Sequence, residues 1–261
     1  MEIYLRKKYQ KVISKDKYIF AEGEVPVCLI AHLDTVFSQP PRHIYEDTAQ
    51  QVMWSPDGLG ADDRAGVAAI ITLIELDLRP SIIFTMEEET TAAGANAIVA
   101  DFPQPPINFK CLIELDRQGY NDCVFYNCDN REFVDYICGF DFVEEYGTCT
   151  DITIIAPAWG IAAVNLSIGY LEEHSRTEQL LLGVAARTIA KVEAILKDES
   201  MPYFEYVPFV AKPTISKVNY CFHCGKEVPA NQVYYIFKGL AAANSPYSFC
   251  VCNECAQRYI N

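Results

Sequence analysis

Short apolar runs alternate with stretches of helical character along most of the chain. Runs at 25–31, 81–85 and 112–115 are rich in Val, Ile and Leu and are bounded by charged or turn-forming residues, which predicts buried strands. Residues 64–78 carry apolar side chains densely enough for a buried helix, and residues 90–100 are rich in alanine, which favours a helix. This alternation predicts an α/β fold with a mostly parallel mixed sheet and helices on both faces.

The segments around this core give weaker signals. Residues 1–24 alternate polar and apolar positions, which is typical of an edge strand or hairpin. The uncharged run at 152–171 is long enough to span a membrane, but prolines and glycines interrupt it, so we interpret it as buried core. Ser175, followed three residues later by Glu178, fits a capping box and predicts a long helix over 178–197.

The composition changes after residue 200. Residues 201–216 mix prolines with aromatic residues, as a linker does, and residues 217–261 carry closely spaced cysteines. We therefore predict a main domain at 1–200, this linker, and a small module at 217–261. A chain of 261 residues with 51% hydrophobic composition has enough apolar material for such an arrangement.

Charge and cysteine content narrow the class of protein. A formal net charge of −14 argues against a nucleic-acid groove or an anionic membrane surface as the main partner, because both require clustered Lys and Arg. The first residues lack the apolar core of a signal peptide, so we expect a cytoplasmic protein without a membrane span. Eleven cysteines in that setting indicate thiols and metal ligands rather than a disulfide framework.

An acidic turn at 58–66 is the first candidate for chemistry. Asp62 and Asp63 lie side by side where the helix at 64–78 begins, and a helix N-terminus offers only about half a positive charge. The two carboxylates could simply cap that helix. A metal ion would balance their charge better.

Further potential ligands follow the ends of predicted strands. In open α/β sheets such positions meet at one edge, so these side chains are expected to lie near the acidic turn. Each has an ordinary structural interpretation when taken alone, but together and in this order they indicate a metal site. They are His32 and Asp34, the triplet Glu87, Glu88 and Glu89, then Asp116 and His174.

The order of these motifs over residues 26–198 resembles that of the co-catalytic dizinc peptidases and amidohydrolases. This clan includes peptidase T, the desuccinylases of lysine biosynthesis and the single-domain zinc aminopeptidases. The resemblance implies a zinc-exopeptidase-like fold. Two-domain members insert a lid before the last histidine, whereas residues 117–173 leave no room for one, so we expect no inserted lid domain.

Residue by residue, the resemblance implies one zinc ion on His32 and Asp116 and another on Glu89 and His174, with Asp62 bridging both. Cobalt or manganese could take the place of zinc. Asp34 would hold the imidazole of His32, and the Asp62–Asp63 peptide bond would be cis.

Glu88 would be the general base beside Glu89, because this alignment matches Gly94 and Ala95 to the glycine and alanine of the family. A shift by one residue, which makes Glu87 the base and Glu88 the ligand, remains open. The donor that stabilises the oxyanion also remains open, with Tyr146 and Tyr170 as candidates.

The implied function is hydrolysis of a peptide or amide bond by metal-activated water, most simply as an aminopeptidase acting on peptides. One alternative is an amidase or deacylase that acts on N-acyl amino acids. Another, of a different class, is an inactive adaptor or binding protein that uses its C-terminal module.

Two C-x-x-C pairs mark that module, Cys221 with Cys224 and Cys252 with Cys255. Two such pairs can hold one tetrahedral structural zinc, as in a zinc ribbon or treble-clef knuckle, and this interpretation is favoured over a redox pair. Cys250 or His223 could replace one ligand. Basic residues are few in the module, so nucleic-acid binding is unlikely there, and the apolar stretch at 239–243 suggests a protein contact.

Overall fold

The chain forms two compact units, Met1–Phe209 and Val210–Asn261. The structure is a computed structural model that describes residues 1–209, 219–221, 224, 226–228, 234–236 and 249–256. Met201 and Phe204 of the predicted linker are buried in the core of the first unit. The rest of that linker, from residue 210, lies outside the described residues, as does the proposed contact segment at 239–243.

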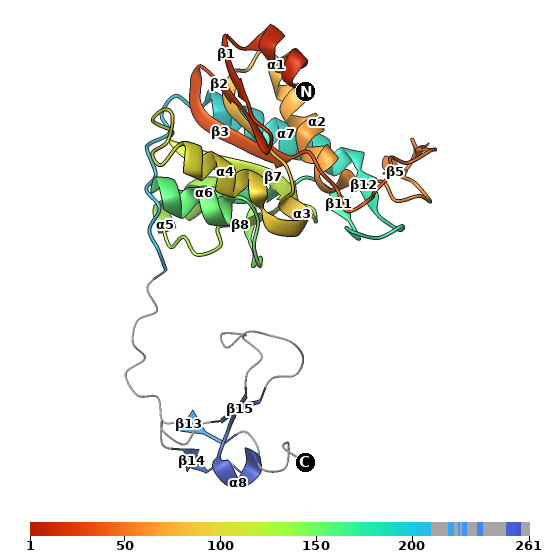
Figure 1. Cartoon of the computed structure of the whole chain (residues 1–261). Coiled ribbons are helices and arrows are strands. Elements are labelled where there is room, and N and C mark those ends of the chain that lie inside the picture. The colour runs from red at the N-terminus through yellow and green to blue at the C-terminus, as the bar shows by residue number, and fades with distance from the viewer. Residues whose placement is uncertain (210–218, 222–223, 225, 229–233, 237–248, 257–261) are drawn as a thin grey trace. The chain divides into compact units, whose positions relative to one another are not determined.

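An eight-stranded mixed sheet forms the centre of the first unit (Figure 1). Its strand order is β1-β2-β6-β3-β7-β10-β8-β9, and the central pairs β6–β3, β3–β7 and β7–β10 are parallel. A hairpin of β1 and β2 closes one edge, which agrees with the pattern at 1–24. The strands are β1 Lys11–Ser14, β2 Tyr18–Glu22, β3 Val25–His32, β6 Pro80–Thr85, β7 Cys111–Arg117, β8 Asp122–Val124, β9 Val143–Glu144 and β10 Ala163–Ser167.

Helices cover both faces of this sheet, and β3 shows how. Its neighbouring residues Leu29 and Ile30 are fully buried in two different apolar clusters, because successive side chains of a strand point to opposite faces. The cluster around Leu29 includes residues of α2 and α7, and the cluster around Ile30 includes residues of α4 and α6. The helices are α1 Glu2–Lys8, α2 Ala61–Glu75, α3 Glu88–Thr91, α4 Ala93–Asp101, α5 Arg131–Cys138, α6 Ile152–Trp159 and α7 Leu182–Lys197. The predicted α/β architecture is confirmed.

No inserted domain interrupts the first unit. Between β7 and β10, residues 118–162 form β8, α5, β9 and α6, all of which belong to the same unit. The uncharged run at 152–171 divides into α6, β10 and the short strand β11. None of the helices in the described part of the chain combines the length and apolar character that a membrane crossing requires.

A smaller antiparallel sheet has the order β11-β12-β5-β4. The predicted helix over 178–197 is wrong at its start. Gln179–Leu181 form strand β12, which pairs with β5, and helix α7 begins only at Leu182. Residues 2–8 are a second correction, since they form helix α1 rather than part of a strand. The strands are β4 Tyr45–Asp47, β5 Val52–Trp54, β11 Tyr170–Leu171 and β12 Gln179–Leu181.

The described residues of the second unit form two short antiparallel strand pairs and one helical turn. Strand β13 pairs with β14 and strand β15 pairs with β16, both antiparallel. The elements are β13 Asn219–Tyr220, β14 Glu227–Val228, β15 Tyr234–Ile236, β16 Phe249–Val251 and α8 Asn253–Ala256. A segment this short has little apolar core of its own, which makes a metal or another constraint necessary for its stability.

Helix α2 lies close against β7 at Gly66. A Cβ atom added there would lie 2.2 Å from the carbonyl oxygen of Leu115 and 2.5 Å from Oδ1 of Asp63. These atoms belong to the strand that carries Asp116 and to the turn that carries Asp62. Only glycine allows the helix and the strand to meet at this distance.

We predict that Gly66→Ala lowers the free energy of unfolding by about 1–3 kcal/mol, because the added methyl group forces α2 away from β7. Chemical denaturation would measure the change. Gly183→Ala in α7 is the matched control, since its added Cβ meets the flexible ends of two side chains, Gln51 at 2.6 Å and Arg187 at 3.7 Å. That control should be neutral or slightly stabilising, and equal effects at both positions would contradict the close-approach argument.

Candidate active site

The candidate residues meet at the carboxyl edge of the central parallel strands. His32 is the last residue of β3, Asp116 lies near the end of β7, and Glu89 lies in α3, which follows β6. Asp62 belongs to the first turn of α2, and His174 lies in the loop between β11 and β12. Segments distant in sequence therefore bring two imidazoles and three carboxylates together.

Asp62 connects two groups of potential metal ligands, one with His32 and Asp116 and the other with Glu89 and His174. Its Oδ1 lies 3.0 Å from Nε2 of His32, and its Oδ2 lies 3.1 Å from Nε2 of His174. The same nitrogens lie 3.6 Å from Oδ1 of Asp116 and 2.9 Å from Oε2 of Glu89, respectively. Each imidazole thus faces one oxygen of Asp62 and one oxygen of a second carboxylate.

These separations suit ligands that surround a metal ion. Zinc binds nitrogen and oxygen donors at about 2.0–2.2 Å, so two donors on one tetrahedral ion lie roughly 3.4 Å apart. The distances on both sides of Asp62 are close to that value. Oε1 of Glu89 is buried and has no hydrogen-bond partner in the described part of the chain, which leaves a ligand atom available. The donor set therefore fits two ions that share the Asp62 carboxylate.

Burial and mutual repulsion raise the pKa of two of the proposed ligand carboxyl groups, those of Asp116 and Glu89. Removal from water, with Asp62 nearby, raises the pKa of Asp116 to about 6 and that of Glu89 to about 7. Burial opposes protonation of His32, but Asp116, Asp34 and Asp62 hold its pKa well above the usual range. The site collects more negative charge than its imidazoles can balance, which favours a cation.

Asp34 connects both parts of the site. Its backbone oxygen lies 3.1 Å from Nδ1 of His32, and its carboxylate oxygen Oδ1 lies 3.5 Å from the same nitrogen. The two carboxylate oxygens also accept hydrogen bonds from the backbone N–H groups of Glu88 and Glu89, at 3.2 and 3.4 Å. Asp34 can therefore orient the imidazole and the start of α3 together.

The three consecutive glutamates point in different directions. Glu89 joins the ligand group, whereas Glu87 forms an ion pair with Lys17 and its side chain is 47% exposed. Glu88 lines the pocket beside the ligands. Burial, with Asp151 and Glu89 nearby, raises the pKa of Glu88 to about 7.

Asp63 does not join either ligand group. Its Oδ1 accepts a hydrogen bond from the backbone of Gly66 at 2.9 Å, and its Oδ2 accepts one from the backbone of His32 at 3.3 Å. The peptide bond between Asp62 and Asp63 is cis, as the family resemblance implied.

Glu178 is a buried residue of the site whose role the sequence analysis missed. Its carboxylate accepts hydrogen bonds from the backbone N–H groups of Gly60 and of Asp62, the latter at 3.1 Å. It therefore secures the turn that presents Asp62. Burial raises its pKa. The capping-box interpretation obscured this role, because it pointed the Glu178 side chain toward its own helix.

Three uncharged side chains form hydrogen bonds with Asp116. The hydroxyl of Tyr170 donates to Oδ1 at 3.1 Å, and the hydroxyl of Thr150 donates to Oδ2 at 3.3 Å. Asn165 accepts from the backbone N–H of Asp116 at 2.9 Å. Tyr146, the other candidate for the oxyanion donor, is 95% exposed. Tyr170 lines the pocket, but its hydroxyl is already used on Asp116.

A pocket opens beside these ligands, with a volume of about 190 Å³. Asp62, Glu88 and His174 lie on one part of its wall, and Arg117 and Glu173 lie on others. It is smaller than the roughly 300–1,000 Å³ of pockets for drug-sized ligands. The pocket therefore suits a short substrate.

Comparison with known proteins places this arrangement in a peptidase fold. No family model and no curated protein matches the sequence. Among solved structures, aminopeptidase PepT from Bacillus cereus is similar, with 17% identity, a TM-score of 0.56, and coverage of 74% of this chain and 91% of that one. The chain has the fold of these peptidases.

Two further structures support that statement. A tripeptidase from Staphylococcus aureus has 12% identity and a TM-score of 0.58, with 75% of this chain and 91% of that one covered. The TET1 peptidase of Pyrococcus horikoshii, which can assemble into a tetrahedron or a large octahedral shell, has 14% identity and a TM-score of 0.54 over 75% of this chain and 92% of that one. The resemblance inferred from the sequence is confirmed at the level of the fold.

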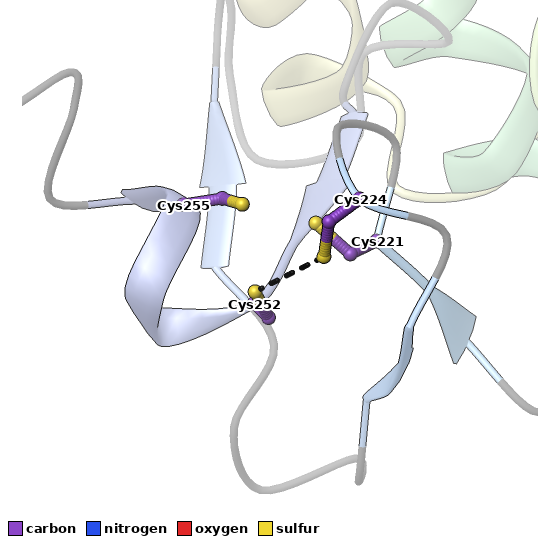
Figure 2. Close-up of side chains that lie close together, drawn as sticks. All are labelled: Cys221, Cys224, Cys252 and Cys255. Carbon is purple, nitrogen blue, oxygen red and sulfur yellow. Dashed lines mark hydrogen bonds between the residues drawn. The ribbon is translucent and has the colours of Figure 1, made fainter.

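A second candidate metal site lies in the C-terminal unit. Figure 2 shows Cys221, Cys224, Cys252 and Cys255 gathered around one point, and their sulfur atoms all lie within 4.8 Å of one another. The sulfurs of Cys224 and Cys252 are 3.8 Å apart, which is too far for a disulfide. Zinc–sulfur bonds of about 2.3 Å in a tetrahedron place two sulfurs roughly 3.8 Å apart. These four cysteines therefore fit a single zinc ion.

His223 and Cys250 are the other two candidates for that site. His223 and the side chain of Cys250 lie outside the described part of the chain. Within the described residues, the cysteine group comprises the two C-x-x-C pairs.

We predict that Glu178→Ala lowers the free energy of unfolding by about 2–5 kcal/mol, because it leaves two buried backbone N–H groups without an acceptor. Metal affinity should fall as well, since the turn that carries Asp62 loses its support. Denaturation and metal titration would measure both effects. Glu172→Ala, an exposed carboxylate of the same loop, is the matched control, and a loss of equal size there would rule out the proposed role of Glu178.

We also predict that protein purified with zinc contains about three ions per chain, two at the Asp62 site and one on the cysteines. Cys221→Ser should remove about one ion and destabilise the C-terminal unit while the other two ions stay bound. Elemental analysis would give the count, and Cys138→Ser, at a half-buried cysteine of α5 that does not line the pocket, serves as control. An unchanged count in Cys221→Ser would refute the structural site.

Proposed function

We propose that this protein is a dizinc hydrolase that cleaves a peptide or amide bond, most simply as an aminopeptidase. One observation supports this above the others. In a chain with a peptidase fold, the two oxygens of Asp62 face two separate imidazole and carboxylate groups. A carboxylate in this position can bridge two cations about 3.5–4 Å apart.

His32 and Asp116 would hold one ion, and Glu89 and His174 the other, with Asp62 shared. Two zinc ions bound there would activate a water molecule and stabilise the negative charge that develops on the substrate oxygen. Cobalt or manganese could serve in their place. Asp34 would keep the imidazole of His32 in one orientation, and Tyr170 and Thr150 would do the same for the carboxylate of Asp116.

Glu88 is the proposed general base. It lines the pocket next to Glu89, yet it belongs to neither ligand group. Its carboxylate would accept a proton from the attacking water and donate it to the leaving amine. The outward ion pair of Glu87 with Lys17 supports this register over the shifted one.

Aminopeptidase action is favoured over deacylase action by the lining of the pocket. Glu173 offers a carboxylate outside the proposed ligand set, and such a group can accept hydrogen bonds from a protonated α-amino group. An N-acylated substrate has no such charge. The similar structures of an aminopeptidase and a tripeptidase support the same choice.

Activity measurements on zinc- or cobalt-loaded protein would test the proposal. The substrates are short peptides with a free amino group, the same peptides with a blocked amino group, and acyl amino acids. Turnover of the free-amino peptides is expected. Turnover of blocked substrates alone would replace the aminopeptidase with an amidase or deacylase. No turnover by fully metal-loaded protein would favour an inactive binding protein.

We predict that Glu88→Gln lowers kcat by about 10²–10⁴-fold while both metals and substrate binding are retained, because glutamine has nearly the same shape but cannot accept the proton. Steady-state kinetics and elemental analysis on one preparation would show this. Glu87→Gln is the matched control and should keep full activity. If Glu87→Gln instead abolishes turnover while zinc stays bound, the register is wrong by one residue.

A further inference from the structure

Arg117 places a guanidinium group in the wall of the pocket. It directly follows Asp116 at the end of β7 and lines the same pocket as Glu88 and His174. Its side chain is only 22% exposed. The proposed hydrolytic steps give this cation no role.

Within the described residues, the guanidinium of Arg117 has no hydrogen-bond partner. Its Nε is buried and unsatisfied, and the nearest carboxylate, Oδ2 of Asp122, lies 3.9 Å away. Arg79 provides a comparison, because its side chain is equally enclosed at 19% exposure. Arg79 donates to the backbone oxygens of Ile74 and Leu78 and to the carboxylate of Asp77.

A largely buried guanidinium that lacks a hydrogen-bonded acceptor among the described residues is expected to bind an anion. Burying the Nε–H donor is unfavourable unless an acceptor replaces the water. The planar fork of an arginine matches the two oxygens of a carboxylate. Asp122 forms only a long ion pair with Nε, at 3.9 Å, which leaves the fork available to an acceptor in the pocket.

We propose that Arg117 binds a carboxylate of the substrate, close to the bond that is cleaved. The inference rests on the proposed function and deepens it by naming a substrate class. Because Arg117 and the proposed ligand Asp116 are neighbours in the chain, their Cα atoms are about 3.8 Å apart. Since Arg117 also lines the same pocket as Glu88 and Asp116, we assign the bound carboxylate to one of the two residues that flank the cleaved bond.

Two sources of this carboxylate share the same chemistry. One is the C-terminal carboxylate of a dipeptide, and the other is the acidic side chain of the residue that is released. Three matched substrates separate them. Alanyl-alanine has the C-terminal carboxylate, aspartyl-alanine amide has only the side-chain carboxylate, and alanyl-alanine amide has neither.

The test measures kcat and KM of the metal-loaded wild type and Arg117→Ala for all three substrates. The wild type should prefer one carboxylate substrate over alanyl-alanine amide. Arg117→Ala should raise KM for that substrate about 10- to 100-fold, with kcat little changed and the amide unaffected. The KM of Arg117→Lys should lie between those of the wild type and Arg117→Ala, since lysine keeps the charge but loses the planar fork.

Arg131→Ala is the matched control. Arg131 lies on α5, and its exposed guanidinium pairs with Glu144, so its loss should leave all three substrates unchanged. Preference for alanyl-alanine identifies the C-terminal carboxylate, and preference for aspartyl-alanine amide identifies the side chain. Equal use of all three substrates, or a preference that survives in Arg117→Ala, would overturn the inference and leave the proposed function intact.

A binding measurement decides the matter if no substrate is turned over, which would contradict the proposed function. Calorimetry with zinc-loaded Glu88→Gln, alone and combined with Arg117→Ala, would use the same three compounds. Tighter binding of a carboxylate compound that depends on Arg117 supports the inference. Equal binding of the compounds with and without a carboxylate, or no binding of any compound, refutes the inference.

Discussion

The crowding of carboxylates around Asp62 is the constraint on which the rest of the site depends. Asp62, Glu89 and Asp116 are largely enclosed, and the two facing imidazoles cannot balance them. Burying that much like charge is unfavourable without a cation. The surrounding hydrogen bonds are consistent with a bound cation. Glu178 holds the backbone at Asp62 and Tyr170 holds the carboxylate of Asp116, and neither neutralises the negative charge.

Much of this arrangement was predictable from the sequence because strand ends converge in a parallel sheet. His32, Asp116 and Glu89 each follow an apolar run, and the topology brings them to one edge. The contribution of Glu178 was not predictable, because it depends on a side chain reaching a turn more than a hundred residues earlier. The lack of a hydrogen-bond acceptor for Arg117 could not be predicted either, since a sequence does not show which donors lack acceptors. Helix α1 was missed because residues 2–8 are too few for a clear period.

Different interactions stabilise the two units. In the first, apolar clusters on both faces of the sheet stabilise the fold, and the proposed ions occupy its edge. In the second, the described elements are short, and the four cysteines are the feature that joins both strand pairs to α8. A metal in the first unit would serve chemistry, and a metal in the second would serve folding.

The two proposed ions also differ in their contact with solvent. The His32 side chain is 1% exposed, whereas that of His174 is 50% exposed and comes from a loop rather than from the central sheet. An ion beside His174 would therefore exchange with the solution faster than one beside His32. Sequential loading could then produce a mixed pair, with one element retained in the interior position and a spectroscopically visible one introduced at the outer position.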